Sequence, residues 1–339
     1  MRNARRRGAI LAGGSRLIFI VAALAVAAIF PASAQTVSLD DILSAVVHIK
    51  TAINPDGRSV ANLGREREGS GIVIDNDGLI LTIGYLMVEA QSAEVTTTDG
   101  RAVGANVVGY DHESGFGLLR AISPLKVHPL PLGHSAELKE QDSVVIVGYG
   151  GRGRVARAQV VSRRAFAGSW EYLLDNAIFT WPPYPDWSGA ALIDRAGKLV
   201  GVGSLVVKDA SGHDDGPGNM FVPIDRLPPI LADLIADGRA SGPGRPWLGV
   251  ITQELGGRLV VAAVAPGGPA EQAGIRHGDI IESVGSAAPK DMADFYRKIY
   301  AQGAAGVTVP LDVRRAEESR HFDVKSMNRL DHLRLKSTY

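Results

Sequence analysis

One stretch decides the fold class: Gly71-Ile72-Val73-Ile74-Asp75-Asn76-Asp77-Gly78-Leu79-Ile80-Leu81-Thr82. Two apolar runs of strand-forming residues flank an Asp-Asn-Asp-Gly turn, which is a strong signature of a β-hairpin. The segments 93–98 and 102–108 flank Asp99-Gly100 in the same way. Short strands repeated at this spacing predict a mainly β protein of the sandwich or barrel type.

The series of short strands continues as far as residue 207. Further apolar runs of strand length lie at 144–147, 158–161, 191–193 and 199–202. Between Asp225 and Gly238 the apolar residues instead recur at helical spacing, with Asp225 as the expected N-cap and Gly238 beyond the last turn. The Gly- and Pro-rich segment 239–246 is typical of an inter-domain linker.

A second, smaller folding unit is predicted after this linker, over residues 247–325. Its expected strands are 247–250, 259–264, 279–284, 307–314 and 321–324. Residues 291–302 have the pattern of an amphipathic helix, with Met292, Phe295 and Ile299 on one face and Gly303 at the end. The C-terminal tail, 326–339, has no clear period and is left unassigned.

The first 34 residues have the composition of an export signal. Five arginines precede an apolar run of 14 residues, Leu17–Phe30, and an A-x-A type site ends at Ala34. The run is shorter than the roughly 20 residues that cross a bilayer as a helix. We therefore expect a signal peptide over 1–34, cleaved after Ala34, and a periplasmic protein. An uncleaved membrane anchor is the alternative.

Composition excludes several kinds of chemistry. The chain has no cysteine, so disulfides, thiol catalysis and cysteine-based metal sites are ruled out. Lysine plus arginine equal aspartate plus glutamate over the whole chain, which gives no indication of nucleic-acid binding. We expect neither a cofactor nor a metal site.

Local sequence adds a resemblance to this all-β pattern. The segments are Glu68-Gly69-Ser70-Gly71-Ile72-Val73-Ile74, Leu132-Gly133-His134-Ser135-Ala136-Glu137-Leu138-Lys139 and Asn219-Met220-Phe221-Val222-Pro223-Ile224. In this order and spacing they resemble the HtrA/DegP family of exported serine proteases. The resemblance implies a chymotrypsin-like double β-barrel over 37–238, followed by a PDZ domain over 247–325.

The resemblance also assigns the catalytic positions, and two of the three have lost their function. Trp187-Ser188-Gly189-Ala190-Ala191-Leu192 lies where the family carries its G-N-S-G-G-P-L nucleophile motif, so Ser188 takes the nucleophile position. Tyr85 stands at the position of the family's histidine and Gly115 at that of its aspartate. Asp186, Trp187 and Ser188 take the oxyanion-hole position. Asp111 matches a structural aspartate of the family, not the catalytic one.

A serine without an adjacent base is a poor nucleophile, and a tyrosine of ordinary pKa near 10 is a poor base at neutral pH. We therefore expect an inactive protease. His112 is expected as a solvent-facing loop residue, His48 as a strand residue and His213 as part of a solvated loop. The segment 181–185, Trp-Pro-Pro-Tyr-Pro, is interpreted either as an aromatic lip of the old cleft or as a packed loop.

The C-terminal unit resembles an HtrA-type PDZ domain. Trp247-Leu248-Gly249-Val250 matches the loop whose backbone amides bind a peptide's terminal carboxylate. The resemblance implies that a peptide adds a strand beside Gly249-Val250 and places a side chain toward the helix that carries Phe295 and Ile299. The alternative is a PDZ fold used only for assembly.

The leading functional hypothesis is an exported pseudoprotease that binds unfolded or C-terminal peptide segments in envelope quality control. One alternative is an active serine endopeptidase with a non-standard base. Another is a regulator of an active relative. The resemblance suggests a homotrimer.

Overall fold

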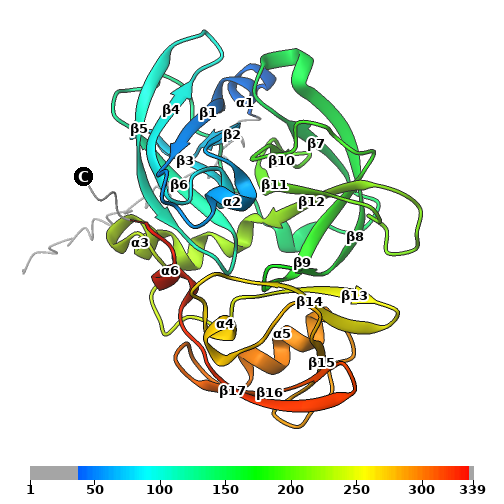
Figure 1. The fold of residues 1–339 in the computed structure, drawn as a ribbon. Coiled ribbons are helices and arrows are strands. Elements are labelled where there is room, and N and C mark those ends of the chain that lie inside the picture. The colour runs from blue at the N-terminus through cyan, green and yellow to red at the C-terminus, as the bar shows by residue number, and fades with distance from the viewer. Residues whose placement is uncertain (1–36, 336–339) are drawn as a thin grey trace, which may run out of the picture. The chain divides into compact units, whose positions relative to one another are not determined.

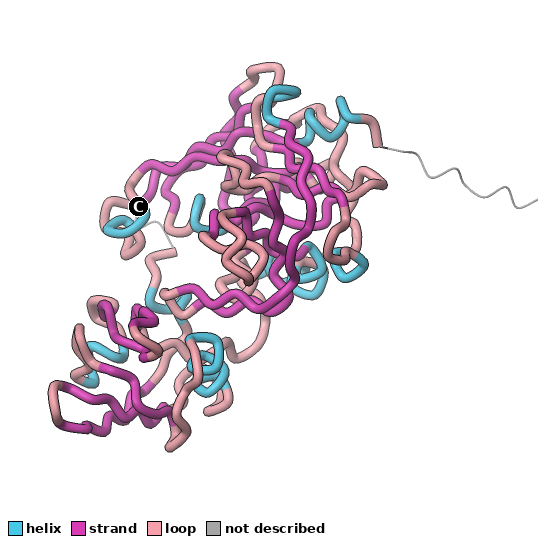
Figure 2. The backbone as a smooth tube through the Cα atoms, turned by 90° about the vertical axis from the view of Figure 1, so that its right-hand side faces the viewer, coloured by secondary structure: helices cyan, strands magenta, loops and turns pink. Residues whose placement is uncertain are grey.

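Two closed β-barrels and one open sheet form the architecture of the computed structural model, which describes residues 37–335 (Figure 1). All three lie within one compact unit of the chain. Strands are far more abundant than helices, and the helices are short (Figure 2). This confirms the expected fold class of a double barrel followed by a second β domain. No helix among residues 37–335 is long and apolar enough to cross a membrane.

The first barrel has six strands in the order β1-β2-β3-β6-β5-β4. They are β1 (Val46–Ile53), β2 (Glu66–Val73), β3 (Leu79–Ile83), β4 (Ala90–Thr96), β5 (Ala102–Tyr110) and β6 (Phe116–Ala121). The predicted hairpin is the β2–β3 pair, in which Ile72 opposes Leu81. The Asp75 carboxylate accepts the Leu79 amide at 2.7 Å and so closes the turn.

The second barrel has six strands in the order β10-β11-β12-β9-β8-β7. They are β7 (Ser143–Val147), β8 (Val155–Gly168), β9 (Tyr172–Trp181), β10 (Ala191–Ile193), β11 (Leu199–Val207) and β12 (Gly218–Pro223). One buried apolar cluster includes Phe116 and Leu81 of the first barrel together with Phe179 and Met220 of the second. The two barrels therefore share a core, and the loops at their junction are held against one another.

A five-stranded sheet with two helices follows the barrels. Its strands are β13 (Val250–Leu255), β14 (Arg258–Val264), β15 (Ile280–Val284), β16 (Thr308–Arg315) and β17 (Glu318–Lys325), paired in sequence order. The helices are α4 (Pro269–Ala273) and α5 (Met292–Tyr300). The Asp291 carboxylate caps α5 by accepting the Asp294 amide at 2.7 Å. The remaining helices are α1 (Leu39–Ala45), α2 (Val60–Leu63), α3 (Pro228–Asp237) and α6 (Arg329–His332).

Two predicted element starts are wrong. Asp225 is not the N-cap of α3, because the helix begins at Pro228 with Leu227 in the cap position. Proline at the first helical position has the backbone angle that a helix start requires, and the Asp225 carboxylate instead accepts the Ala136 amide at 2.7 Å. The expected strand 247–250 does not form either, because Gly249 has φ +82° and β13 begins only at Val250.

Candidate functional site

Ser188 lies on the loop between β9 and β10, where the first barrel contacts the second. Its carbonyl accepts the Ser70 amide of β2 at 2.8 Å. The next residue, Gly189, has φ +73°, and its amide donates to the Gly203 carbonyl of β11 at 2.9 Å. A Cβ at Gly189 would lie 1.9 Å from the Ser70 carbonyl oxygen, so only glycine fits. These contacts fix the Ser188 loop between the barrels.

Tyr85 is the hydrogen-bonding partner of the Ser188 hydroxyl. The two oxygens are 2.9 Å apart, and the Tyr85 hydroxyl donates its only proton to the Ser204 carbonyl at 2.8 Å. Ser188 is therefore the donor to Tyr85. Burial raises the pKa of Tyr85 to about 12, although hydrogen bonds with Ser188 and Trp187 oppose the shift. At pH 7 only about one phenol in 10⁵ is ionised, so Tyr85 is not a useful base for Ser188.

Gly115 lies on the loop between β5 and β6, next to the turn that carries Tyr85. Its carbonyl accepts the Gly84 amide at 2.7 Å, and its φ is +82°. A Cβ at this position would lie 3.2 Å from the Tyr172 hydroxyl, which donates to the Ser114 carbonyl at 2.7 Å. The Tyr172 hydroxyl therefore lies in tight contact with the position at which an aspartate side chain would begin. The Asp111 carboxylate binds Ser114 within the same turn, at 2.7 Å from its amide and 2.6 Å from its hydroxyl.

Asp186 and Trp187 precede the serine at the position expected for an oxyanion hole. The Asp186 carboxylate forms an ion pair with Arg154 and is 43% exposed. Its negative charge is thus taken up by a surface arginine. The Trp187 carbonyl accepts the Ala190 amide at 3.0 Å, which closes a tight turn around Ser188.

Only Tyr184 of the aromatic segment 181–185 before this loop is buried. Tyr184 is 6% exposed, its hydroxyl donates to the Arg154 carbonyl at 2.9 Å, and its amide donates to the Asn219 side chain at 2.6 Å. Trp181 differs, with 52% exposure. The structure thus supports the packed-loop interpretation for Tyr184 and leaves a single aromatic side chain on the surface.

None of the three histidines named above, His112, His48 and His213, is a hydrogen-bond partner of Ser188 in the described residues. The expectation that His112 faces solvent is wrong, because it is half-buried and accepts a hydrogen bond from Arg329 at 3.0 Å. Burial and the Arg329 charge hold the pKa of His112 well below its ordinary value. His48, which lies on β1, stacks on the ring of Tyr149, and His213 is exposed in a loop. Among residues 37–335 no cluster of side chains could hold a metal ion.

The predicted peptide-binding residues lie on the 247–250 loop and on α5. Phe295 and Ile299 of α5 are fully buried in the same apolar cluster as Leu248 and Val250. Trp247 is also buried, and its ring lies 4.6 Å from that of His332. The structure therefore brings four of the six predicted residues, Leu248, Val250, Phe295 and Ile299, into one apolar cluster. The Trp247 ring lies against Gly249.

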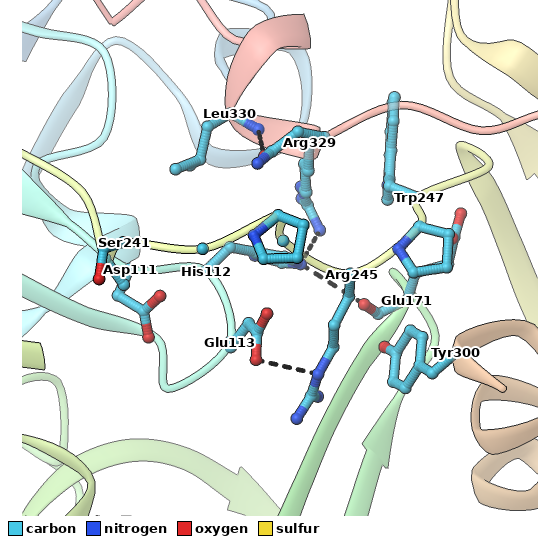
Figure 3. A pocket seen from close by; sticks show the side chains of 16 residues that line it. Asp111, His112, Glu113, Glu171, Ser241, Arg245, Trp247, Tyr300, Arg329 and Leu330 are labelled. Atoms are coloured by element: carbon cyan, nitrogen blue, oxygen red, sulfur yellow. Dashed lines mark hydrogen bonds and ion pairs between the residues drawn. The ribbon is translucent and has the colours of Figure 1, made fainter. Parts of the chain in front are cut away.

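A partner of this loop was missed by the sequence analysis. Glu171 lies in the turn between β8 and β9, and its carboxylate accepts the Leu248 and Val250 amides at 2.9 and 2.6 Å. A neighbouring cavity of about 270 Å³ is lined by Glu171, His112, Arg245, Trp247 and Arg329, among others (Figure 3). A single acidic residue in a turn gives no sequence signal for such a contact, because its partners are 77 and 79 residues away.

Comparison with known proteins defines the class. Residues 69–202 match the trypsin-like peptidase domain and residues 246–326 match the PDZ domain. The serine protease PepD of Mycobacterium tuberculosis is 30% identical over 319 residues, which cover 86% of this chain and 66% of PepD. A protein of Bartonella henselae named "Probable periplasmic serine endoprotease DegP-like" is 28% identical over 277 residues, covering 76% of this chain and 52% of the relative.

A solved structure extends the likeness to the whole fold. The HtrA-type protease AlgW with a decapeptide has a TM-score of 0.53 and 20% sequence identity, and the match covers 90% of this chain and all of AlgW. The chain is thus an HtrA/DegP-like protein with one trypsin-like peptidase domain and one PDZ domain. It spans between half and two thirds of the length of the two curated relatives above.

Proposed function

We propose that this protein is an exported, proteolytically inactive HtrA-like protein that binds unfolded or C-terminal peptide segments. One observation carries the proposal: the Ser188 hydroxyl is hydrogen-bonded to a neutral phenol whose own proton is committed to the Ser204 carbonyl. The serine at the nucleophile position therefore has no group that can take its proton.

The expected loss of rate is large. Removing the serine or the histidine of a triad lowers turnover by about a millionfold in a well-studied protease. About 10³ to 10⁴ of the rate over water can survive through the oxyanion hole and substrate binding alone. Here the side chain at Gly115 is also missing, and the Tyr172 hydroxyl lies 3.2 Å from where its Cβ would be. The site thus lacks both the base and the group that would orient it.

The binding role is supported by the PDZ domain. We take residues 37–238 as the peptidase-like domain, 239–246 as the linker and 247–325 as the PDZ domain. The backbone groups of the edge strand β13 and the amides of the 248–250 loop are those that an added peptide strand and its carboxylate would use. In the structure the Leu248 and Val250 amides are bonded to the Glu171 carboxylate, which a peptide would replace. The similar AlgW structure was solved with a decapeptide, which supports a peptide as the partner.

Export to the periplasm is part of the proposal. The DegP-like relative is named as periplasmic, and the basic, apolar and A-x-A order of residues 1–34 is that of a signal peptide. These residues lie outside those that the structure describes. We propose cleavage after Ala34, a role in envelope quality control and assembly as a homotrimer.

A casein assay tests the proposal. The protein beginning at Gln35 is incubated with fluorescently labelled casein, alongside Ser188→Ala and Tyr85→His variants. We expect no cleavage by any of the three and retention of casein by all of them on a sizing column. Cleavage that Ser188→Ala abolishes would overturn the proposal and establish a serine endopeptidase with a non-standard base. Absence of casein binding would overturn the binding role.

A further inference from the structure

The carboxylate-binding loop of the PDZ domain already holds a carboxylate. Glu171 is 3% exposed, and its two carboxylate oxygens accept the Leu248 and Val250 amides separately, at 2.9 and 2.6 Å. The Gly249 amide faces the same group, because a φ of +82° turns the backbone there. Successive amides curved around one anion form a nest that matches a carboxylate.

The turn that carries Glu171 also follows the path of a bound peptide. β13 pairs with β14 on one side only, and on its other side the Thr252 amide donates to the Ser169 carbonyl at 3.0 Å. From the opposite side, the Tyr296 hydroxyl of α5 donates to the Gly168 carbonyl at 2.7 Å. The turn therefore lies between the edge strand and the helix.

The segment that follows Glu171 also places an apolar side chain in the PDZ domain, as a bound peptide would. Leu173 belongs to the second barrel by sequence, yet it is 3% exposed and packs in the PDZ cluster that contains Leu248, Phe295 and Ile299. Its carbonyl accepts Arg245 of the linker at 3.2 Å. An anion in the amide nest, a strand-edge hydrogen bond and a buried leucine are the three features by which an extended peptide is held in such a groove.

We propose that residues 168–173 are a built-in ligand of the PDZ groove, with Glu171 in the place of a peptide's terminal carboxylate. A C-terminal peptide then binds only by displacing this turn from β13 and α5. The proposal deepens the proposed function in one respect, since it takes the PDZ groove as the peptide site. It does not depend on whether Ser188 is active.

The test compares the mature protein with Glu171→Gln, which keeps the shape of the side chain but replaces one acceptor oxygen by a donor. The probe is a fluorescein-labelled decapeptide that ends in leucine with a free carboxylate. The same peptide with a C-terminal amide is the ligand control. Glu113→Gln is the matched protein control, because Glu113 lines the same cavity but pairs with Arg245 and not with the loop.

At pH 8, where Glu171 is ionised in the folded protein, we expect Glu171→Gln to bind the free-carboxylate peptide at least about tenfold more tightly than the wild type, since a hydrogen bond to a charged group contributes about 1.5 to 3 kcal/mol. Glu113→Gln should bind like the wild type, and the amidated peptide should bind weakly to all three. Equal affinity of wild type and Glu171→Gln, whether tight or absent, would overturn the proposal.

Amide hydrogen exchange supplies a second, independent readout. In the wild type the Leu248 and Val250 amides should be protected, in Glu171→Gln they should exchange faster, and the peptide should restore their protection. Unchanged exchange in the variant would show that Glu171 does not close the loop. Retention of casein is measured separately, so a failure of the built-in ligand and a failure of the binding role give different results.

Discussion

At the scale of single residues, the hydrogen bond between Tyr85 and Ser188 determines what the serine can do chemically. The phenol fills the position of a base, but burial raises its pKa to about 12 and its proton bonds the Ser204 carbonyl. This residue thus has a structural role at the barrel junction. It holds the Ser188 loop against β11 through its hydrogen bonds with Ser188 and the Ser204 carbonyl.

Replacing Tyr85 by phenylalanine should therefore lower stability. The change leaves the Ser204 carbonyl and the Ser188 hydroxyl without their partner, at a cost of about 1 to 2 kcal/mol in the free energy of unfolding. Urea denaturation measures this difference. Tyr149→Phe is the control, because no hydrogen bond of the Tyr149 hydroxyl is seen among residues 37–335. Equal losses in the two variants would contradict the assignment.

A histidine at position 85 should not restore normal proteolysis. The imidazole would have no carboxylate at Gly115 to orient it, and removing the equivalent group from a triad lowers turnover by about 10⁴. The Tyr172 hydroxyl also occupies the adjoining space. Initial rates on a chromogenic peptide, compared between Tyr85→His and Tyr85→His with Ser188→Ala, give the measurement. Turnover at the level of an ordinary serine protease would show that another group orients the histidine.

At the scale of elements, close backbone contacts set the shape of the loops at the barrel junction. A Cβ at Gly189 would clash with the Ser70 carbonyl oxygen. A Cβ at Gly203 would lie 2.0 Å from the Trp187 carbonyl oxygen. Ser188 is thus held by the backbone of β2 and β11 on either side. These contacts fix the backbone of the Ser188 loop independently of any catalytic role.

Gly189→Ala should be among the most destabilising single changes in the chain. It combines a φ of +73° with a Cβ 1.9 Å from the Ser70 oxygen, so we expect a loss of at least about 3 kcal/mol. Gly153→Ala is the control, because a Cβ there meets nothing within 4 Å and its φ is not positive. Thermal melting of both variants tests this, and a Gly189→Ala protein that melts like Gly153→Ala would refute the close contact.

Sequence patterns predicted those elements whose signal is local. The β2–β3 hairpin was predicted because Asp75 and Gly78 define its turn, and the end of α3 because Gly238 adopts φ +74°. The start of α3 was misplaced because two prolines overrode the capping signal of Asp225. β9 was not predicted at all, since its residues 172–181 continue into an aromatic, proline-rich segment without a clear alternation.

The candidate site likewise has a part that the sequence predicted and a part that it could not predict. Resemblance to a family placed Tyr85, Gly115 and Ser188 together in advance, and the structure puts Tyr85 and Ser188 within 2.9 Å. It could not indicate Glu171, because that contact depends on how the second barrel meets the PDZ sheet. Nor could it indicate that His112 is half-buried, since Arg329 approaches it from 217 residues away.

At the scale of the whole molecule, Glu171 joins the second barrel to the PDZ domain. Its carboxylate is buried among charged and titratable groups from several elements. They are Arg329 of α6, Arg245 of the linker, Tyr296 and Tyr300 of α5, and His112 of the β5–β6 loop. Burial raises the pKa of Glu171 to about 7, although hydrogen bonds from the 248–250 loop and the Arg329 charge lower it.

This pKa predicts a pH dependence of stability. The folded protein keeps the proton of Glu171 up to about pH 7, whereas the unfolded chain loses it near pH 4.5. Between these values the folded state binds more protons, so the contribution of Glu171 to stability is fully present below about pH 4.5 and is lost as the pH rises to about 7. The closed turn should therefore open most readily at neutral and alkaline pH.

Urea unfolding at pH 5, 6, 7 and 8 checks this prediction in the wild type and in Glu171→Gln. Contributions of other groups, including His112, are common to both proteins and cancel in the difference. The free energy of unfolding of the wild type should fall relative to that of the variant as the pH rises to about 7. Above that pH the difference between the two proteins should stay constant. Parallel curves over the whole range would contradict the shift.

Glu171 and Tyr172 are neighbours in the chain, so a movement of their turn affects contacts in both the PDZ domain and the first barrel. The Glu171 carboxylate binds the 248–250 loop of the PDZ domain, while the Tyr172 hydroxyl lies beside Gly115 in the first barrel. A peptide that displaces the first residue must also strain or withdraw the second. Substitutions around Gly115 that disfavour the packed tyrosine would therefore favour the displaced turn and make peptide binding tighter. The two domains would then act as one thermodynamic unit, linked by adjacent residues of a single turn.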